Sequence, residues 1–361
     1  MSYLVAIGTA LPAFASDQMK IHAFMEKELS GSDDDRTKLR LLYERSAIQT
    51  RYSVLPDFII PDGEQTFFKH NEPQPQLEQR LEQYYLQAPE LAAMAILNTL
   101  HAHELNTVTH LITVSCTGMW APGLDIAVVK KLGLNDTIQR TSVNFMGCYA
   151  AIHAMKMADS ICRSQSSAKV LIVSIELCTL HFQRSNNAEQ LTANALFADG
   201  AAACIVQSKA PAASVPHLQL HSFYSKVLPD SQTDMAWHIT HNGFLMQLSS
   251  YVPFLIQTNI AGLVQQAVEH YNLQVNDISC WAIHPGGRKI LDYIASALNL
   301  KRNQLSYSYD TLANYGNMSS ATLLFVMKQL LNDEAAKGFV FGAAFGPGLT
   351  METFIAKKHV A

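Results

Sequence analysis

The chain has 361 residues, 48% of them hydrophobic and 16% charged, which is the balance of a well-buried globular protein and argues against disorder. Its formal net charge of -4 argues against nucleic acid as a general partner, because such partners attract a surplus of Lys and Arg. The length exceeds what one compact core normally holds, so we expect two domains, residues 1–208 and 209–361.

The first residues, MSYLVAIGTALPAFA, predict a strand and a turn rather than a secretory leader. No positive charge precedes the apolar stretch, and Gly8 and Pro12 interrupt it. No apolar run reaches the roughly 18 to 20 residues that a membrane helix needs. We therefore expect no membrane association and a cytoplasmic chain, in which six widely spaced cysteines stay reduced and form neither disulfides nor a zinc site.

Short apolar runs alternate with helical patterns along the chain. Buried strands are predicted at 109–115, 168–177, 201–208 and 338–344, and helices at 150–162, 260–270 and 321–331. This alternation predicts an α/β architecture. Prolines break the segment 209–246, which we expect to be a connection and a lid near the pocket, and the acidic run 30–36 predicts a solvated turn and helix cap.

The two halves of the sequence repeat one order of elements. In the first, a strand leads to the CTG loop at Cys116, and the GCYAAIHAMKMA helix follows at Cys148. In the second, the strand ISCWAI leads to the HPGG loop at His284, and GNMSSATLLFVMKQL follows at Asn317. The spacing is 32 positions in the first half and 33 in the second, which indicates an internal duplication. Two halves packed about a pseudo-twofold axis would bring Cys148, His284 and Asn317 together.

These residue types predict nucleophilic chemistry. Cys148 stands where a strand turns into a helix, and the unpaired N–H groups and the positive dipole there, with a nearby imidazole, lower a thiol pKa to roughly 3.5 to 7.5. His284 precedes Pro285, Gly286 and Gly287, which form a sharp turn that leaves room beside the imidazole. Asn317 is either a helix cap, a hydrogen-bond donor to a substrate, or both.

Cys, His and Asn suit two chemistries. In a cysteine hydrolase, His takes the thiol proton and Asn orients the imidazole. In a decarboxylating condensing enzyme, Cys carries an acyl group as a thioester, while His and Asn donate hydrogen bonds to a second thioester and stabilise its enolate. The residues alone leave both open.

The motifs GCYAA, HPGG, YGNMSSA and FGPGLTMET resemble, in this order, those of type III polyketide synthases, the chalcone and stilbene synthase family, in a bacterial form. The resemblance implies a thiolase-like α/β fold of two similar halves in αβαβα layers, a homodimer, and no resident cofactor. It implies repeated decarboxylative condensation of malonyl-CoA onto a starter acyl-CoA, then cyclisation to a pyrone or resorcinol. Cys148 would carry the acyl group, His284 would activate it, and Asn317 would assist decarboxylation.

The same resemblance assigns binding residues. Phe197 falls on the gatekeeper between the CoA tunnel and the cavity, and Met246 stands where the second gatekeeper Phe is expected. Cavity positions are occupied by Cys116, Thr117, Cys178 and His181. Lys38 and Arg45 match positions that hold CoA phosphates, but Leu41 replaces a basic residue between them. Neighbouring Arg40, or Arg288 and Lys289, could substitute for it, or an acyl carrier protein could replace CoA as the donor.

Two other activities remain as rivals. A single-step ketosynthase would join two acyl chains on the same scaffold, and a thioester hydrolase would use the same three residues. The number of malonyl units in the product separates the three. Histidines such as His101 and His103 lack carboxylate or Cys partners at ligand spacing, so we expect no metal site.

Overall fold

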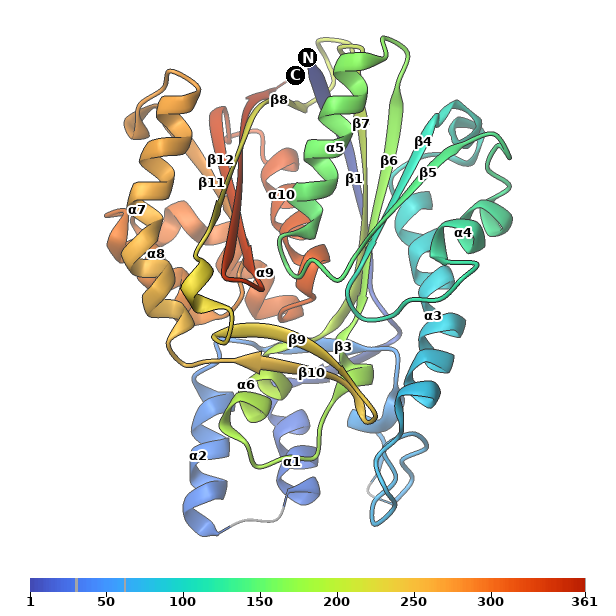
Figure 1. Ribbon diagram of the computed structural model, residues 1–361, viewed down its shortest axis with the longest axis vertical. Helices are drawn as coiled ribbons and strands as arrows, with labels where there is room; N and C mark the ends of the chain where they lie inside the picture. The colour runs from blue at the N-terminus through green and yellow to red at the C-terminus, as the bar shows by residue number, and fades with distance from the viewer. Residues whose placement is uncertain (30–31, 62, 361) are drawn as a thin grey trace.

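The computed structural model describes residues 1–29, 32–61 and 63–360 (Figure 1). Its main sheet has nine strands in the order β11-β12-β13-β8-β1-β7-β6-β4-β5. The strands of the first half are β1 (Ser2–Ala10), β4 (His110–Ser115), β5 (Gln139–Asn144), β6 (Lys169–Leu177) and β7 (Asp199–Gln207). Those of the second half are β8 (His217–Val227), β11 (Ile278–Ile283), β12 (Gly338–Gly346) and β13 (Thr350–His359).

Helices cover the two blocks of strands in layers (Figure 1). The helices α3 (Leu77–Leu97) and α4 (Leu124–Leu132) lie outside the first block, and α7 (Val252–His270) and α8 (Arg288–Ala297) lie outside the second. Between the blocks lie α5 (Ala150–Ser164) and α10 (Thr322–Asn332), with α9 (Ser306–Tyr315) at one end of them. The predicted αβαβα layers are confirmed.

The two blocks repeat one pattern of strand pairing. In the first, β1 pairs antiparallel with β7, β7 antiparallel with β6, and β6 parallel with β4. In the second, β8 pairs antiparallel with β13, β13 antiparallel with β12, and β12 parallel with β11. The blocks join through the antiparallel pair β1 and β8. The same order and directions support the internal duplication that the spacing indicated.

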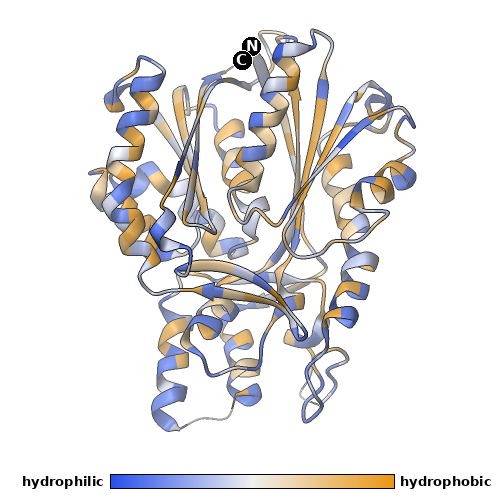
Figure 2. Ribbon diagram, viewed as in Figure 1, coloured by the Kyte–Doolittle hydropathy of each residue, from blue (hydrophilic) through white to orange (hydrophobic). Residues whose placement is uncertain are grey.

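Three buried apolar clusters hold the layers together. The central cluster joins α5 and α10 to the inner faces of both blocks, and includes Met155 and Met327. A second packs α3 against β6 and β7, and a third packs α7 and α8 against β11 and β12. Strands covered on both faces need continuous apolar sequences rather than alternation, which is why β6 and β12 could be identified from sequence. Figure 2 shows the apolar residues along these strands.

One end of the molecule is built from shorter elements (Figure 1). These are β2 (Phe14–Asp17), α1 (Gln18–Glu28), α2 (Asp33–Glu44), β3 (Thr50–Ser53), α6 (Ala188–Leu196), β9 (Met235–Thr240) and β10 (Gly243–Leu248). Three single-turn 3-10 helices matter for the site: η1 (Pro56–Phe58), η3 (Cys178–His181) and η7 (Ser319–Ala321). Ser32 caps α2 through a capping box with Asp35, as the acidic run predicted, whereas Ser30 and Gly31 lie outside the described residues.

The prediction for residues 209–246 is wrong in part. The segment contains β8, which lies in the middle of the main sheet between β1 and β13. Pro211, Pro216 and Pro229 all stand outside β8, so they interrupt no ladder hydrogen bond. The hairpin of β9 and β10 fits the expected lid position better (Figure 1). Within the described residues, no helix is both long and apolar enough to span a bilayer.

Candidate active site

A strained loop presents Cys148. After β5 the chain adopts positive φ at Phe145 (59°) and Gly147 (90°). A Cβ at Gly147 would stand 2.2 Å from Cδ of Pro347, so only glycine fits there. Cys148 follows directly, immediately before the residue that caps α5, and is 5% exposed. The sequence GC therefore fixes the thiol at the buried start of the central helix.

Ser319 connects the thiol to Asn317. The Cys148 thiol donates to Oγ of Ser319 at 3.5 Å. Ser319 has φ of 47°, a left-handed conformation that is uncommon for a residue with a side chain and is often found at functional sites. Its backbone N–H donates to Oδ1 of Asn317 at 2.9 Å. Ser319 of the second half thus contacts Cys148 of the first and links it to Asn317.

Asn317 is held at both backbone and side chain. Its N–H donates to the carbonyl of Leu196, and its carbonyl accepts from Ala198, both at 2.9 Å. Nδ2 donates to the carbonyl of Gly286 at 3.3 Å, while Oδ1 accepts from Ser319. One N–H of the amide has no protein partner among the described residues, so it is available to a substrate. Asn317 is not the cap of either following helix, since Met318 caps η7 and Ala321 caps α10, but its side chain accepts from Ser319 and keeps one N–H free of a protein partner among the described residues.

His284 follows β11 directly and is 1% exposed. Its backbone N–H donates to the carbonyl of Ala343 at 2.8 Å, which extends the parallel pairing by one residue. Neither ring nitrogen has a hydrogen-bond partner within the described part of the chain. Burial lowers the pKa of the imidazole to about 3, so at neutral pH the ring is uncharged and can accept a proton.

The pKa of Cys148 differs from the expectation of a lowered value. Burial raises it to about 12, and the hydrogen-bonding interaction with Ser319 only partly opposes this. The reason is that the start of α5 lies inside the protein. Loss of hydration there destabilises a thiolate more than the positive end of one helix stabilises it. At neutral pH the free chain therefore holds a neutral Cys148 thiol and a neutral His284 imidazole.

Glu176, near the end of β6, is a site residue that the sequence reasoning missed. It is fully buried, and Oε2 accepts from the backbone of Cys116 at 2.9 Å and from Oγ1 of Thr117 at 2.8 Å. Ser320 donates to Oε1. Burial raises the pKa of this carboxyl to about 7. An acidic residue inside the apolar strand KVLIVSIEL was the available signal, because a buried carboxyl needs donors around it.

The expected cavity residues separate into two groups. Phe197, Met246, Cys178 and His181 line one cavity. Cys116 and Thr117 do not line this cavity: the sulfur of Cys116 accepts from the N–H of Gly147 at 3.0 Å, and Thr117 donates to Glu176. Burial raises the pKa values of the Cys116 and Cys178 thiols well above their ordinary value. The first group forms a cavity wall, and the second supports the loop that precedes Cys148.

His181 is fixed by its neighbours. One ring nitrogen, Nε2, lies 2.7 Å from the carbonyl of Thr117, and the other, Nδ1, accepts from the N–H of Phe244 at 3.1 Å. These partners require a neutral ring with the proton on Nε2, and burial lowers its pKa to about 3. The ring stacks on Phe244 at 4.3 Å, and Trp237 stands edge-on to it. Trp237 also donates to the carbonyl of Cys116 at 2.7 Å, so these three rings form a rigid wall.

The four basic residues predicted for CoA lie on two elements, and no contact joins them within the described residues. Lys38 is exposed on α2, pairs with Asp34 at 2.5 Å, and lines a groove between α1, α2 and α6. Arg45 is exposed at the end of α2. Arg288 and Lys289 are exposed at the start of α8, where Arg288 pairs with Asp292. Among the described residues, no group of three His, Cys, Asp or Glu could hold a metal ion.

Comparison with known sequences identifies relatives of both halves. Residues 1–210 match the family model for chalcone and stilbene synthases, N-terminal domain, and residues 219–359 match the C-terminal domain of the same family. "Alpha-pyrone synthesis polyketide synthase-like Pks18" of Mycobacterium tuberculosis is 32% identical over 335 residues, which cover 90% of this chain and 83% of that protein. "Probable polyketide synthase 1" of Dictyostelium discoideum is 28% identical over 99% of this chain, but the match spans only 12% of that protein.

Solved structures show the same fold. The C-terminal type III polyketide synthase domain of "Steely1", a type I/III hybrid from Dictyostelium, superposes with a TM-score of 0.92 at 27% identity and 99% coverage of both chains. PKS-I from the brown alga Ectocarpus siliculosus superposes with a TM-score of 0.90 at 25% identity, again over 99% of both chains.

Proposed function

The chain belongs to the chalcone and stilbene synthase family and is a type III polyketide synthase, and we propose that Cys148, His284 and Asn317 perform its chemistry. The observation that carries this assignment is the chain of contacts from Cys148 through Ser319 and Asn317 to the loop that follows His284. These contacts link Cys148 of one half to Asn317 and to the loop after His284 of the other, which supports a shared site for the proposed nucleophile, base and donor.

In the loading step, the starter acyl-CoA brings its carbonyl to Cys148. His284, uncharged at neutral pH, accepts the thiol proton, and the sulfur attacks the carbonyl carbon. The bond from carbon to the CoA sulfur breaks, and the imidazolium returns its proton to CoA. Burial disfavours the Cys148 thiolate and the His284 imidazolium, and this order of steps leaves both residues uncharged once the proton has passed to CoA.

In the extension step, malonyl-CoA loses carbon dioxide. The electron pair of the breaking carbon–carbon bond becomes an enolate, whose oxygen accepts hydrogen bonds from His284 and from the free N–H of Asn317. The enolate carbon then attacks the thioester on Cys148, forms the new carbon–carbon bond and releases the thiolate. This produces a 3-oxoacyl-CoA, which can reload Cys148 for another round or cyclise to a pyrone or resorcinol.

The rival activities receive less support. A hydrolase needs a path for water to the acyl group, but Cys148, His284 and Asn317 are each at most 5% exposed. A single-step ketosynthase shares the three residues, but both halves match the polyketide synthase family. Two relatives named for polyketide synthesis, one of them for alpha-pyrones, further favour repeated extension.

CoA thioesters are proposed as substrates of this enzyme, with no resident cofactor. Lys38 and Arg45 would meet the phosphates at α2, since exposed cations pair readily with phosphate, and Arg288 and Lys289 would do so at α8. Lys38 lines a groove beside α6, the helix that leads to Phe197, which supports an approach from this side. The alternative is that an acyl carrier protein donates the acyl group. An acyl substrate without phosphate groups would test this alternative.

A homodimer is proposed through β5. This strand ends the nine-stranded sheet, and five of its six residues are exposed, so its unpaired backbone groups can pair with a second copy. It leads directly into the nucleophile loop, so pairing would also support Cys148. A cytoplasmic location is proposed because all six cysteines are free; five of them are buried and one is partly exposed.

Mass spectrometry tests the function most simply. Incubation with malonyl-CoA and a panel of aliphatic and aromatic acyl-CoAs should give products with two or more malonyl-derived units. Free acid alone would indicate a hydrolase, and one new carbon–carbon bond in every product would indicate a single-step ketosynthase.

A further inference from the structure

Each extension step of the proposed function consumes one proton. Malonyl-CoA enters with an ionised carboxylate and loses neutral carbon dioxide, so the negative charge passes to the enolate. When the enolate carbon forms the new carbon–carbon bond, the bond from Cys148 to the acyl group breaks and the charge leaves on sulfur. Burial raises the pKa of this thiol to about 12, so the sulfur takes up a proton at neutral pH. Loading needs no outside proton, because the thiol proton passes to CoA.

The three residues of the proposed mechanism do not provide this proton. Cys148, His284 and Asn317 are each at most 5% exposed, so bulk water does not surround the sulfur. Burial lowers the pKa of His284 to about 3, so its uncharged ring is not an acid at neutral pH. The extension step therefore needs another acid close to Cys148 with a connection to solvent.

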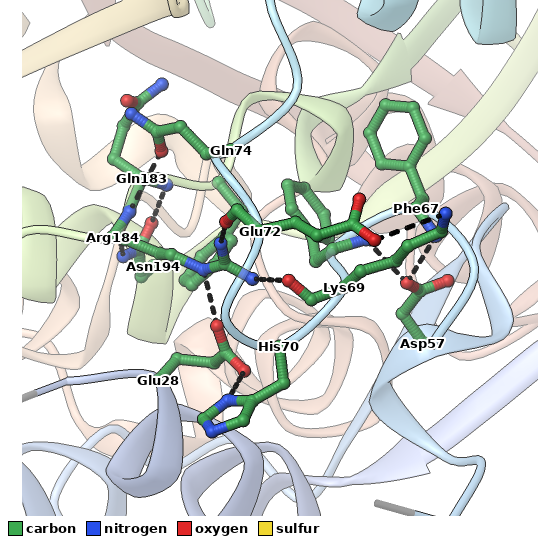
Figure 3. Close-up of polar contacts among 12 residues, drawn as sticks. Glu28, Asp57, Phe67, Lys69, His70, Glu72, Gln74, Gln183, Arg184 and Asn194 are labelled. Atoms are coloured by element: carbon green, nitrogen blue, oxygen red, sulfur yellow. Dashed lines mark hydrogen bonds and ion pairs between the residues drawn. The ribbon is translucent and has the colours of Figure 1, made fainter. Parts of the chain in front are cut away.

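Two enclosed carboxylates of the first half are held by donors that favour their ionised form. Figure 3 shows both, Asp57 and Glu28, with their partners. Oδ1 of Asp57 accepts from the backbone N–H groups of Phe67 and Phe68 at 2.8 and 2.7 Å. Glu28 forms an ion pair with Arg184. Donors of these kinds stabilise a carboxylate, so neither group suits a proton donor.

Glu176 is enclosed in a different way. It is fully buried, and Oε2 accepts from the hydroxyl of Thr117 at 2.8 Å, while Oε1 accepts from the hydroxyl of Ser320. No Lys, Arg or His contacts its oxygens within the described part of the chain. Burial raises its pKa to about 7, so its protonated and ionised forms are both populated near neutral pH. Hydroxyl partners both donate and accept, so they can exchange protons with this carboxyl.

The ionisable groups around Glu176 are uncharged. They are Tyr84 on α3, Cys116 after β4, Cys148 before α5 and Cys178 on η3, and burial raises the pKa of each. Glu176 is therefore the group of this set whose charge changes near neutral pH.

Three hydroxyl groups lead from Glu176 toward the surface. Tyr84 donates to Oγ of Ser115 at 2.6 Å, and Oγ of Ser115 lies 3.4 Å from Oγ1 of Thr117. Because Thr117 gives its own proton to Glu176, Ser115 is the donor to Thr117. All three hydroxyls thus point toward the carboxyl, and we call Tyr84, Ser115 and Thr117 the hydroxyl relay.

The outer end of the hydroxyl relay meets a polar hollow. Tyr84 and Ser115 line it, together with Thr113 and the exposed Asn144 at the end of β5. Its free volume for water-sized molecules is ≈ 120 Å³, which is room for several waters. Water in this polar hollow can give a proton to the relay.

The inner end of the relay lies beside the nucleophile. Ser320 donates to Glu176, and its neighbour in η7, Ser319, accepts from the Cys148 thiol at 3.5 Å. The negative charge of an ionised Glu176 further raises the pKa of Cys148. Protonated Glu176 therefore makes the departing thiolate less unfavourable, and it is also the form that can neutralise it.

We propose that Glu176 is the proton donor of the extension step, and that the hydroxyl relay returns a proton to it from the polar hollow. The proposal rests on the proposed function. When the bond from Cys148 to the acyl carbon breaks, the proton of Glu176 passes by way of Ser320 and Ser319 to the sulfur. The relay then restores the carboxyl, so one proton is taken from water for each carbon dioxide released.

The variant Glu176→Gln tests the donor while keeping its shape. The amide oxygen can accept from Cys116 and Thr117 as the carboxylate does. The amide N–H can donate to Ser320, whose hydroxyl can then turn to Oγ of Ser174, 2.7 Å away. An amide releases no proton near pH 7, so proton donation is lost and the hydrogen bonds are kept.

We expect Glu176→Gln to load an octanoyl group within about twofold of the normal rate but to extend it about 10²-fold more slowly, as on loss of a general acid. Intact protein mass measures loading, and product formation from malonyl-CoA measures extension. Turnover of the unsubstituted protein should fall as pH rises above about 7, whereas the slower turnover of the variant should not change there.

Equal loss of loading and extension would mean that Glu176 only supports the loop before Cys148. Unchanged extension would remove Glu176 from the reaction, and turnover of the unsubstituted protein that ignores pH above 7 would exclude it as the acid. Each of these results overturns the proposal. Failure of the proposed function is distinct, because the product masses of the unsubstituted protein show whether extension occurs at all.

The variant Thr117→Val tests the relay by removing its last hydroxyl. It should slow extension to a similar extent and leave loading intact, and Thr117→Ser should recover most of the extension rate. Thr353→Val is the matched control, because it removes a buried hydroxyl of β13 that donates to the carbonyl of Tyr224 at 2.8 Å, and it should change neither rate. Equal extension by Thr117→Val and Thr117→Ser would overturn the relay. If either Thr117→Val or Glu176→Gln does not fold, the other provides the test.

Discussion

The two halves of the sheet share one order of strands but differ where they face the site. In the first half, Cys148 stands before α5 and Glu176 lies near the end of β6. In the second, Asn317 stands before α10, and β12, GFVFGAAFG, has no ionisable residue. The duplicated framework therefore places different side chains at equivalent positions of the two halves. In the proposed mechanism, the first half holds the covalent intermediate, and the second supplies the base and the donor.

The largest effect on polyketide formation should come from replacing Cys148, which the first half contributes to the proposed mechanism. Cys148→Ala should lower polyketide formation by about 10³-fold or more, because no acyl group can be held. Cys148→Gln should do the same but retain malonyl-CoA decarboxylation, since His284 and Asn317 remain. Radiolabelled carbon dioxide and product mass report the two activities separately. Polyketide from the Ala variant would show that another residue carries the acyl group.

Replacing Asn317 should have the opposite pattern: decarboxylation slows, and acyl loading of Cys148 continues. Asn317→Ala should slow decarboxylation by about 10² to 10³-fold, which is typical for loss of one donor to an enolate or oxyanion. Loading of Cys148 should continue, because Asn317 takes no part in it. The intact mass of the protein after incubation with acyl-CoA measures loading. Equal loss of loading and decarboxylation would mean that Asn317 acts in both steps and is not specific to decarboxylation.

Glu176 provides a pH-dependent comparison. Its folded pKa of about 7 lies above the ordinary 4.5, so the unfolded chain releases the proton first as pH rises. Glu176 alone should therefore lower stability by about 3 kcal/mol between about pH 4.5 and pH 7. Asp199, whose pKa burial raises to about 6, acts in the same direction, whereas His181 and His284, with pKa values lowered to about 3, raise stability as pH rises to about 6.5. The difference in free energy of unfolding between the protein and its Glu176→Gln variant isolates Glu176, and a difference that does not change with pH across this window would contradict the assignment.

Smaller effects are expected at the ring wall and the gate. Trp237→Phe removes the hydrogen bond to the carbonyl of Cys116, worth about 1 kcal/mol, and should loosen the wall enough to broaden the range of product lengths. Met246→Phe should narrow the range of starters, because a stiff ring replaces a flexible chain. Product profiles measure both. An unchanged profile for Met246→Phe would mean that Met246 does not control passage.

The proximity of three segments could be predicted from sequence because their motifs lie at element ends that the duplication fixes. GC, HPGG and GNMSSA each combine a polar residue with glycine turns or a helix start, and contacts from Cys148 through Ser319 and Asn317 to Gly286 join the three segments. The catalytic roles of Cys148, His284 and Asn317 remain a proposal. The pKa of Cys148 could not be predicted, because the helix start is visible in sequence but its burial is not. Trp237 was missed since its partner, Cys116, lies far away along the chain. β8 was missed because Pro216 and Pro229 flank it, and prolines so close together in the sequence suggested that no strand lies between them.

The central claim is that Cys148 holds a starter that is extended repeatedly. The most direct test is incubation with octanoyl-CoA and ¹³C-labelled malonyl-CoA, with mass spectrometry of the peptide that contains Cys148 and of the released products. We predict an octanoyl adduct on Cys148 and products with at least two labelled units. An adduct on another residue, or products with no more than one labelled unit, would contradict the account.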